Sequence, residues 1–394
     1  MKLLVIAPFY RFFVKEHIDH ISRHVDEVHV VVHHNKLSEL SKYIPLGGFF
    51  EHVRHFTREK LIDMTDTPDN VSVHVLDLIY FTPDNRNRSL PDKISKLYFK
   101  HFQERFRFDI IHAHFTWPSG FVAYRLKRNL GIPIVVTTHA LHKSRVEFFN
   151  KINALDFWHQ TDAIINVSKK CYDLLKEMGI DETKLWYIPN GVDLEKFFPM
   201  STSEARERLG IPQDKKILLS VGNLVEKKGF EYGITAMKKV VRVRRDVELY
   251  IIGDGYLKEK LKQLISTNGL NDFVHLVGFK PHSQIPLWMN AADVFLLPSI
   301  VENFGVVNIE AMACGKPIVS TYNGGSEEII TSEDYGLLCP SRDPECLAEK
   351  ILIALEKEWN RAKIRKHAEI FGWKNITAKT LNVYQEVISR NEKV

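Results

Sequence analysis

Two glutamates eight positions apart, Glu302 and Glu310, have the spacing in this sequence that is best suited to binding a ligand. A strand-like run ends before them, a glycine-containing turn follows, and the segment EAMACG is expected to form a helix. Both carboxylates can then face one ligand, and the free backbone amides at the start of the helix can bind a phosphate group. A carboxylate can also accept hydrogen bonds from two vicinal hydroxyls at once. The alternative for Glu310 is a solvated helix position, which its apolar neighbours Ile309, Ala311 and Met312 disfavour.

A second candidate site is the loop Gly222–Gly229, with the sequence GNLVEKKG, between a strand-like run and a predicted helix. Lys228 on this loop could neutralise a departing diphosphate, an effect of about 3 kcal/mol by analogy with a lost oxyanion donor. The alternative is a solvated Lys-Lys-Gly turn, and the motif alone does not decide between them. Gly253 and Gly255 follow another strand, but Lys258 stands where a dinucleotide fingerprint needs its third glycine. This pair therefore indicates a tight turn beneath a ligand.

Strand-like runs alternate with helical stretches along the whole chain. The runs are rich in Val, Ile and Leu without polar alternation, as expected for parallel strands that helices cover on both faces. Turn residues interrupt both the strand and the helix periodicity near residues 190 to 200. The sequence therefore predicts two doubly wound α/β domains that face each other across a cleft. The runs are KLLVIAPF, VHVVVHH, VSVHVLDL, DIIHAHF, PIVVTTH and AIINVS before this hinge, and KILLSVGNL, VELYIIG, VHLVGF, VFLLPS, PIVSTY and GLLCP after it.

The composition excludes several classes of protein. A chain of 394 residues with 44% hydrophobic content can form two to three packed domains, which excludes long disorder. The net charge of +5 comes from 54 basic and 49 acidic residues without a basic tail, so nucleic-acid binding is set aside. No apolar run approaches the ~20 residues that cross a bilayer, and the opening KLLVIAPF lacks a cleavage-site pattern, so we expect a cytoplasmic protein. Four cysteines without a C-x-x-C pair fit reduced thiols rather than a metal site.

The order of these motifs resembles glycosyltransferase family 4, whose members are retaining enzymes of the GT-B fold. The resemblance extends over nearly the whole chain, and the E-x7-E pair is its most specific part. It implies an acceptor-binding Rossmann-like domain at residues 1–194, joined by a returning helix at about 373–394, and a nucleotide-sugar-binding Rossmann-like domain at 195–372. The motifs are DIIHAHF, IPIVVTTHALH, DAIINVS, IPNGVDLEKFFP, GNLVEKKG, IIGDG, VHLVGF, AADVFLLPSIVENFGVVNIEAMACGKPIVST, NGGSEE, YGLLCP and FGWKNITAKTLNVYQEVI.

The resemblance assigns roles to individual residues of this sequence. Glu310 matches the glutamate that holds the nucleotide ribose, and Glu302 matches the one that contacts the donor sugar and its phosphate region. Lys228 matches the lysine that clamps the diphosphate, and His139 matches the histidine that reaches the donor sugar near its reacting carbon. With Glu302, these two form the implied catalytic set. The other implied donor contacts are Gly222, Asn223, Gly253, Asn303, the base-reading pair Phe279 and Lys280, and the amides of Phe304, Gly305 and Val306.

Two positions depart from the family pattern. Asn223 stands where an arginine usually accompanies the lysine. One of the positive charges that would contact the diphosphate is therefore missing or is supplied by another residue. The family's N-terminal glycine pair is replaced by Phe-Tyr-Arg-Phe-Phe at residues 9–13. Tyr10 and Arg11 in this segment are candidates for acceptor or diphosphate contact, and Arg11 for the missing charge. The alternative is that this loop simply packs.

The implied reaction moves a hexose-type sugar from a nucleotide-diphosphate sugar to a glycan, polysaccharide or lipid-linked acceptor, with retention at the anomeric carbon. Attack from the face of the departing diphosphate leaves the protein to position the reactants and stabilise negative charge. No carboxylate near His139 suggests a glycosyl-enzyme nucleophile. The chain has no D-x-D sequence, so we expect neither a metal nor a cofactor besides the donor. The alternative is a non-catalytic sugar-nucleotide-binding or scaffold subunit, which Asn223 favours and the intact Lys228 disfavours.

Histidines near the N-terminus raise the alternative of a metal site. Three of them, His17, His20 and His24, share a predicted helical face. Another two, His112 and His114, share a strand face. No acidic or cysteine ligand completes either set at close spacing, so we favour packed or solvated roles.

Two segments raise the question of peripheral contact with the inner face of the cell membrane. Lys93–Phe108 is amphipathic and basic, so it either rests on an anionic leaflet or covers the N-terminal sheet, and we favour the sheet. Tyr43–Arg58 lacks clean periodicity and is the better candidate for acceptor or surface contact.

Overall fold

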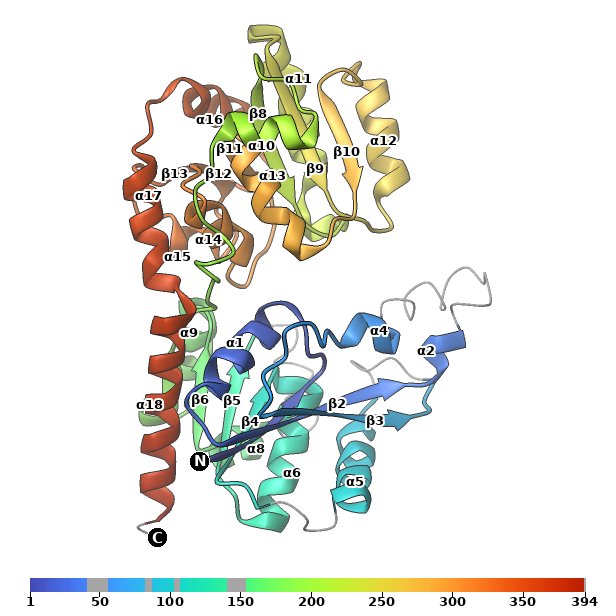
Figure 1. Cartoon of the computed structure of the whole chain (residues 1–394), viewed down its shortest axis with the longest axis vertical. Coiled ribbons are helices and arrows are strands. Elements are labelled where there is room, and N and C mark those ends of the chain that lie inside the picture. The colour runs from blue at the N-terminus through green and yellow to red at the C-terminus, as the bar shows by residue number, and fades with distance from the viewer. Residues whose placement is uncertain (41–55, 82–86, 103–106, 140–153, 393–394) are drawn as a thin grey trace. The chain divides into compact units, whose positions relative to one another are not determined.

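The chain folds into two compact units. The first comprises Met1–Pro189 together with Trp373–Val394, and the second comprises Asn190–Gly372. Each contains one parallel sheet with helices on both faces (Figure 1). This confirms the predicted class of two Rossmann-like, doubly wound domains. The computed structural model describes residues 1–40, 56–81, 87–102, 107–139 and 154–392.

The first unit is built on a seven-stranded parallel sheet. Its strands are β1 (Lys2–Ala7), β2 (Glu27–Asn35), β3 (Val71–Leu78), β4 (Ile110–His114), β5 (Ile134–Thr138), β6 (Ala163–Asn166) and β7 (Leu185–Tyr187), in the order β3-β2-β1-β4-β5-β6-β7. Side chains alternate along β1: Leu4 and Ile6 enter one hydrophobic core, whereas Leu3 and Val5 enter the other. This burial on both faces explains the unbroken apolar runs. Strand β7 was not predicted, because three residues are too short to give a periodic signal.

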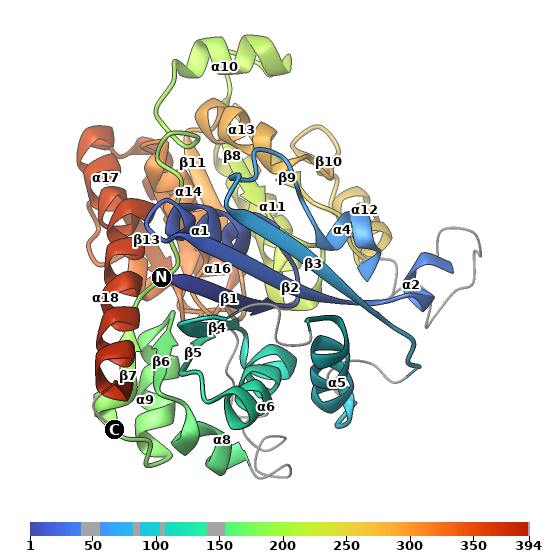
Figure 2. The ribbon, with the colours of Figure 1, turned by 60° about the horizontal axis from the view of Figure 1, so that its bottom comes forward.

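Helices cover both faces of this sheet. The C-terminal helix α18 packs beside α1 in the first unit (Figures 1 and 2). Its Val383 and Tyr384 are fully buried in the same core as Val14 and Ile18 of α1. The helical elements are α1 (Phe12–Ser22), α2 (Leu37–Leu40), α4 (Arg58–Leu61), α5 (Leu90–Phe102), η3 (Thr116–Gly120), α6 (Phe121–Leu130), α8 (Ala154–Gln160), α9 (Lys169–Glu177), η4 (Glu182–Lys184) and α18 (Trp373–Asn391).

Helix α5 contains most of the first of the two candidate membrane segments. Its apolar residues Ile94, Tyr98 and Phe102 are buried in the core that lies on one face of the sheet. These three residues of the stripe therefore cover the sheet, as favoured, while residues 103–106 of the segment lie outside the described residues. Of the second segment, residues 41–55 lie outside the described residues, and contact of this segment with a membrane stays a prediction that liposome flotation can test. None of the helices within the described ranges is long and apolar enough to cross a membrane.

The second unit has a six-stranded parallel sheet. Its first three strands are added toward one edge and its last three toward the other edge. Its strands are β8 (Lys216–Val221), β9 (Val247–Ile252), β10 (Val274–Gly278), β11 (Val294–Leu297), β12 (Ile318–Thr321) and β13 (Gly336–Cys339), in the order β10-β9-β8-β11-β12-β13. Because β8 lies next to β11, the loops after these two strands meet at a topological switch point, where such folds bind ligands. The helical elements are α10 (Thr202–Leu209), η5 (Glu226–Lys228), α11 (Phe230–Val243), α12 (Lys258–Thr267), η6 (His282–Gln284), α13 (Ile285–Ala291), α14 (Val306–Ala313), α15 (Ser326–Ile329), α16 (Pro344–Glu356), α17 (Arg361–Ala368) and η7 (Glu369–Phe371).

Candidate functional site

The loops after β8 and β11 bring Lys228 and Glu302 into contact. Lys228 Nζ lies 2.5 Å from Glu302 Oε1, and the two side chains are only 15% and 11% exposed. Ser299 Oγ donates a second hydrogen bond to the same carboxylate oxygen at 2.6 Å. The backbone joins the loops as well, since the amide of Ile300 donates to the carbonyl of Lys227 at 2.8 Å. The sequence-predicted lysine and glutamate, 74 residues apart, thus form one charged centre at the switch point.

Glycine is required where the lysine-bearing turn ends. The single turn η5 stops at Gly229, which has a φ of +61° and precedes α11. A Cβ atom at Gly229 would lie 2.2 Å from the carbonyl oxygen of Pro298, at the end of β11. The close approach of these two backbones therefore depends on glycine, and it holds Lys228 beside the loop that carries Glu302.

Gly253 has a similar role between the loops after β8 and β9. Its φ is +152°, and a Cβ atom there would lie 1.9 Å from the carbonyl oxygen of Gly222. The amide of Gly222 in turn donates to the carbonyl of Ile252 at 2.9 Å. Glycine is therefore needed at position 253 for the tight packing of two strand exits, in keeping with the tight turn that the G-x-G pattern indicates.

Glu310 lies inside α14, and its carboxylate is buried. The side chain is 8% exposed, and Glu310 Oε1 accepts a hydrogen bond from His282 Nε2 at 2.9 Å. The alternative of a solvated helix position is therefore wrong. The helix begins after Gly305, whose φ of +86° turns the chain out of the loop that carries Glu302. The segment between the two glutamates contains the half-buried Asn303, the buried Phe304 and the first helical residue, Val306.

The other predicted donor contacts lie around the same sheet edge. Phe279 follows β10 and is 63% exposed, and Lys280 beside it is half-buried. This pair is three and two residues from His282, the partner of Glu310. Asn223 is exposed on the loop after β8. The roles of all these residues toward a donor stay predictions.

His139 belongs to the first unit, at the exit of β5. It is buried, and its Nε2 lies 2.9 Å from Nδ1 of His114. The rings of Phe13 and Phe115 lie 5.1 and 4.6 Å from the His139 ring, centroid to centroid. These contacts orient the imidazole, and its role toward a sugar stays a prediction.

The structure corrects the prediction for Tyr10. This residue is fully buried, its hydroxyl donates to Asp19, and its backbone pairs with Leu61 and Asp63. Acceptor or diphosphate contact by Tyr10 is therefore wrong, because both its side chain and its backbone are engaged in the core. Arg11 next to it donates to the carbonyl of Lys60, and burial lowers the pKa of its guanidinium.

The N-terminal histidines have partners within the protein. His17 Nε2 lies 3.1 Å from Thr380 Oγ1 of α18, and His112 Nε2 lies 2.7 Å from Thr137 Oγ1. Tyr384 OH lies 2.5 Å from His112 Nδ1. In the part of the chain that the structure describes, no group of three or more His, Cys, Asp or Glu side chains is arranged to hold a metal ion.

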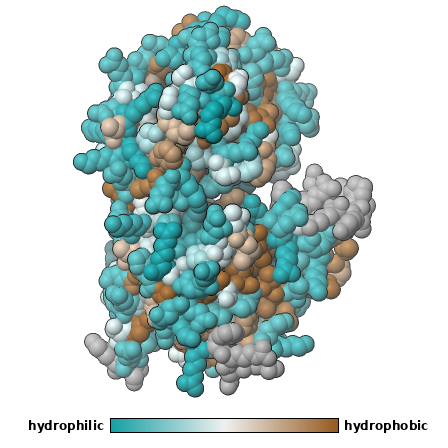
Figure 3. Space-filling view, viewed as in Figure 1, coloured by the Kyte–Doolittle hydropathy of each residue, from teal (hydrophilic) through white to brown (hydrophobic). Residues whose placement is uncertain are grey.

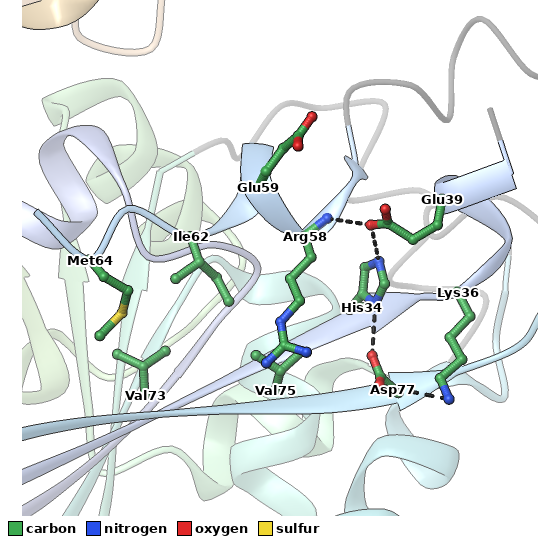
Figure 4. Close-up of a pocket in the computed structure, with 10 residues that line it drawn as sticks. All are labelled: His34, Lys36, Glu39, Arg58, Glu59, Ile62, Met64, Val73, Val75 and Asp77. Carbon is green, nitrogen blue, oxygen red and sulfur yellow. Dashed lines mark hydrogen bonds and ion pairs between the residues drawn. The ribbon is translucent and has the colours of Figure 1, made fainter. Parts of the chain in front are cut away.

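A separate cavity of about 870 Å³ lies beside α4 and the outer strands β2 and β3 of the first unit (Figure 4). His34 stands between two carboxylates, with Nδ1 2.7 Å from Asp77 and Nε2 3.1 Å from Glu39. Hydrophobic residues gather on this side of the first unit (Figure 3), and Val73 and Val75 form part of the cavity wall. Of the residues singled out from the sequence, Arg58, the last residue of the Tyr43–Arg58 segment, lines this cavity, whereas the predicted donor-site and catalytic residues do not.

Two residues that touch the charged groups were not predicted from the sequence. Ser299 lies two residues after the end of β11, in a run of apolar residues, and only its contact with Glu302 indicates a role in the site. His282 lies 28 residues before Glu310, on a different element, so no periodic spacing connects them. The one available signal was the location of both residues at strand exits.

Comparison with known proteins defines the family. Residues 12–196 match the family "Glycosyltransferase Family 4", and residues 201–371 match "Glycosyl transferases group 1". The chain is 31% identical over 296 residues to an uncharacterized glycosyltransferase of Methanocaldococcus jannaschii, a match that covers 71% of this chain and 75% of the relative. It is 29% identical over 307 residues to the D-inositol 3-phosphate glycosyltransferase of Paenarthrobacter aurescens, covering 72% and 74%.

Solved structures share the fold over the full length. Sucrose-phosphate synthase from Thermosynechococcus elongatus has a TM-score of 0.77 at 20% identity, covering 99% of this chain and 100% of that one. Anabaena HepE in complex with UDP has a TM-score of 0.74 at 20% identity, covering 98% and 100%. The protein is a glycosyltransferase of the GT-B type, a transferase acting on nucleotide sugars. It belongs to glycosyltransferase family 4, which confirms the resemblance seen in the sequence.

Proposed function

We propose that this protein is a retaining glycosyltransferase that moves a hexose from a nucleoside-diphosphate sugar to a glycan, polysaccharide or lipid-linked acceptor, without a metal ion or a cofactor. The observation that carries the proposal is the Lys228–Glu302 centre at the switch point of a family 4 chain, next to the helix that contains Glu310. This arrangement offers a cation for a diphosphate and carboxylates for hydroxyl groups.

Each charged group would contact a different part of the donor. The Lys228 ammonium would stabilise the charge that grows on the diphosphate as the sugar bond breaks, which a divalent metal would otherwise do. Glu302, already held by Ser299, would contact the sugar and its phosphate region. Glu310 would accept from the ribose hydroxyls. In front-side attack the leaving phosphate oxygen takes the acceptor proton, so His139 would position the sugar near its reacting carbon rather than act as a nucleophile.

UDP-sugars are the first donors to test. Anabaena HepE has been solved with UDP and with UDP-glucose, and pneumococcal GtfA has been solved with UDP and GlcNAc. A screen of UDP-, GDP- and ADP-sugars by thermal shift and donor hydrolysis would identify the base and the sugar. If no sugar nucleotide of the three classes shifts the melting temperature or is hydrolysed, the proposal is overturned.

Glu310→Gln tests the ribose contact directly. The substitution keeps the size of the side chain but weakens charge-assisted hydrogen bonds of roughly 1.5 to 3 kcal/mol each, so we expect donor affinity to fall at least tenfold. Isothermal titration calorimetry with the nucleotide found in the screen measures this change. Glu259→Gln, on α12 of the same unit with a side chain 80% exposed, is the matched control and should bind as the wild type does. An unchanged dissociation constant for Glu310→Gln would remove Glu310 from the site.

A non-catalytic sugar-nucleotide-binding subunit is the second candidate. It is favoured by Asn223, an exposed amide where the family usually has an arginine. The two candidates differ in turnover: a scaffold would bind the nucleotide tightly and release no labelled sugar to any acceptor or to water. Product formation in a discontinuous radiochemical assay would exclude it.

A further inference from the structure

His282 makes the only side-chain hydrogen bond that the described residues offer to the Glu310 carboxylate. A carboxylate accepts and does not donate, so the ring proton of His282 lies on Nε2, 2.9 Å from Glu310 Oε1. Among the described residues no donor reaches the other oxygen, Glu310 Oε2. This leaves one carboxylate oxygen held by the protein and one available to a ligand.

The position of His282 is itself fixed. It opens the short turn η6, which is closed by a hydrogen bond of 2.9 Å from the amide of Gln284 to the carbonyl of Pro281. Its ring packs against the ring of Phe197 at 5.4 Å between centroids, and Phe197 is 1% exposed. His282 therefore donates from a held position, while its own side chain remains 30% exposed.

We infer that His282 is a positioning residue for nucleotide binding, which fixes the Glu310 carboxylate so that Oε2 faces the ribose hydroxyls. This inference rests on the proposed function, because it takes Glu310 as the ribose contact. A carboxylate turns readily about its terminal torsion. A donor on Oε1 removes that freedom before the ligand arrives, which lowers the entropy cost of binding. Since His282 follows Phe279 and Lys280 by three and two residues, the same loop would connect recognition of the base with recognition of the ribose.

Two substitutions separate positioning from packing. His282→Leu removes the donor, whereas His282→Gln offers an amide N–H in a similar place. We expect His282→Leu to weaken binding of the recognised nucleotide five- to tenfold and His282→Gln to stay within about twofold of the wild type. The probes are UDP, GDP and ADP, measured by isothermal titration calorimetry.

The decisive comparison uses the matching 2′,3′-dideoxynucleoside diphosphate. This probe has no ribose hydroxyls for Glu310 to accept from, so the wild type and His282→Leu should bind it equally well. In a Glu310→Gln background, His282→Leu should add no further loss. Equal weakening of His282→Leu toward the ribose and dideoxy probes would overturn the inference, because it would show a general packing role.

The chain offers a matched control. His275 donates to Glu248 at 3.0 Å, with the histidine 34% and the glutamate 12% exposed, in the same unit. His275→Leu breaks an equivalent pair and should leave nucleotide affinity unchanged. If the wild-type chain binds none of the three nucleotides, the proposed function fails and this inference with it. If the wild type binds and His282→Leu binds equally tightly, the inference alone fails.

Discussion

Lys228→Ala is expected to lower kcat by roughly 10² or more, with a smaller rise in KM. This is the scale of losing one preorganised electrostatic donor in a site of low polarity. The usual second cation is absent, since Asn223 occupies that position, and Lys228 Nζ is directed to Glu302. Its charge should therefore matter more while the diphosphate leaves than while the donor binds. Steady-state kinetics with the donor from the screen measures the two constants separately.

The neighbouring lysine gives the control for this prediction. Lys227 is exposed on the same turn, and Lys227→Ala keeps the carbonyl that accepts from Ile300. It should turn over at the wild-type rate. Lys228→Ala also leaves Glu302 buried without its cation, so a thermal melt must show that the variant is folded. Lys228→Arg retains the charge and should recover part of kcat, although the guanidinium geometry differs. Normal turnover of folded Lys228→Ala would place the stabilising charge elsewhere in the protein.

The fold was predictable because its signals are local. Unbroken apolar runs separated by helical periodicity define parallel strands, and all twelve runs named from the sequence correspond to the strands other than β7. The Lys228–Glu302 contact was only partly predictable. Each residue lies after a strand-like run, but their contact depends on β8 lying next to β11, and strand order is set by the whole sheet.

Side-chain partners were the least predictable feature. The Phe-Tyr-Arg-Phe-Phe segment fits a ligand loop and a packed turn equally well, and the burial of Tyr10 decides the matter for that residue alone, so the contact predicted for Arg11 stays a prediction. His282 was missed for the same reason, because a histidine after a strand has no pattern until its partner Glu310 is placed. Helices and strands can thus be predicted from the local sequence. A site built from two elements that are distant in the sequence can be identified only when the tertiary structure is known.

A buried histidine cluster should make the first unit sensitive to mild acid. The rings of His112 and His114 lie 4.4 Å apart, and His17 lies 6.0 and 5.6 Å from them, between centroids. Burial lowers the pKa of all three well below 6.5, and repulsion from neighbouring histidines lowers the pKa further. These side chains are therefore neutral in the folded protein, where they have hydroxyl and imidazole partners.

The sign of the pH effect follows from proton binding. Below about pH 6.5 the unfolded chain takes up protons that the folded cluster cannot accept, so the free energy of unfolding falls as the pH falls. Each histidine contributes about 1.4 kcal/mol per pH unit, so three together give a slope of up to ~4 kcal/mol per pH unit between the unfolded and folded pKa values. Above pH 7 this contribution is complete, and stability should be flat with respect to these groups.

Urea unfolding at intervals from pH 5.5 to pH 8 measures this slope. The free energy should be steady from pH 8 to 7 and then fall steeply, by up to ~4 kcal/mol at pH 5.5, where most carboxylates are still ionised. His17→Gln keeps a polar partner for Thr380 but does not titrate, so it should reduce the slope by about one third. His101→Gln, exposed on α5 of the same unit, should leave the slope unchanged. A stability that does not change between pH 8 and 5.5 would show that the cluster accepts protons without unfolding.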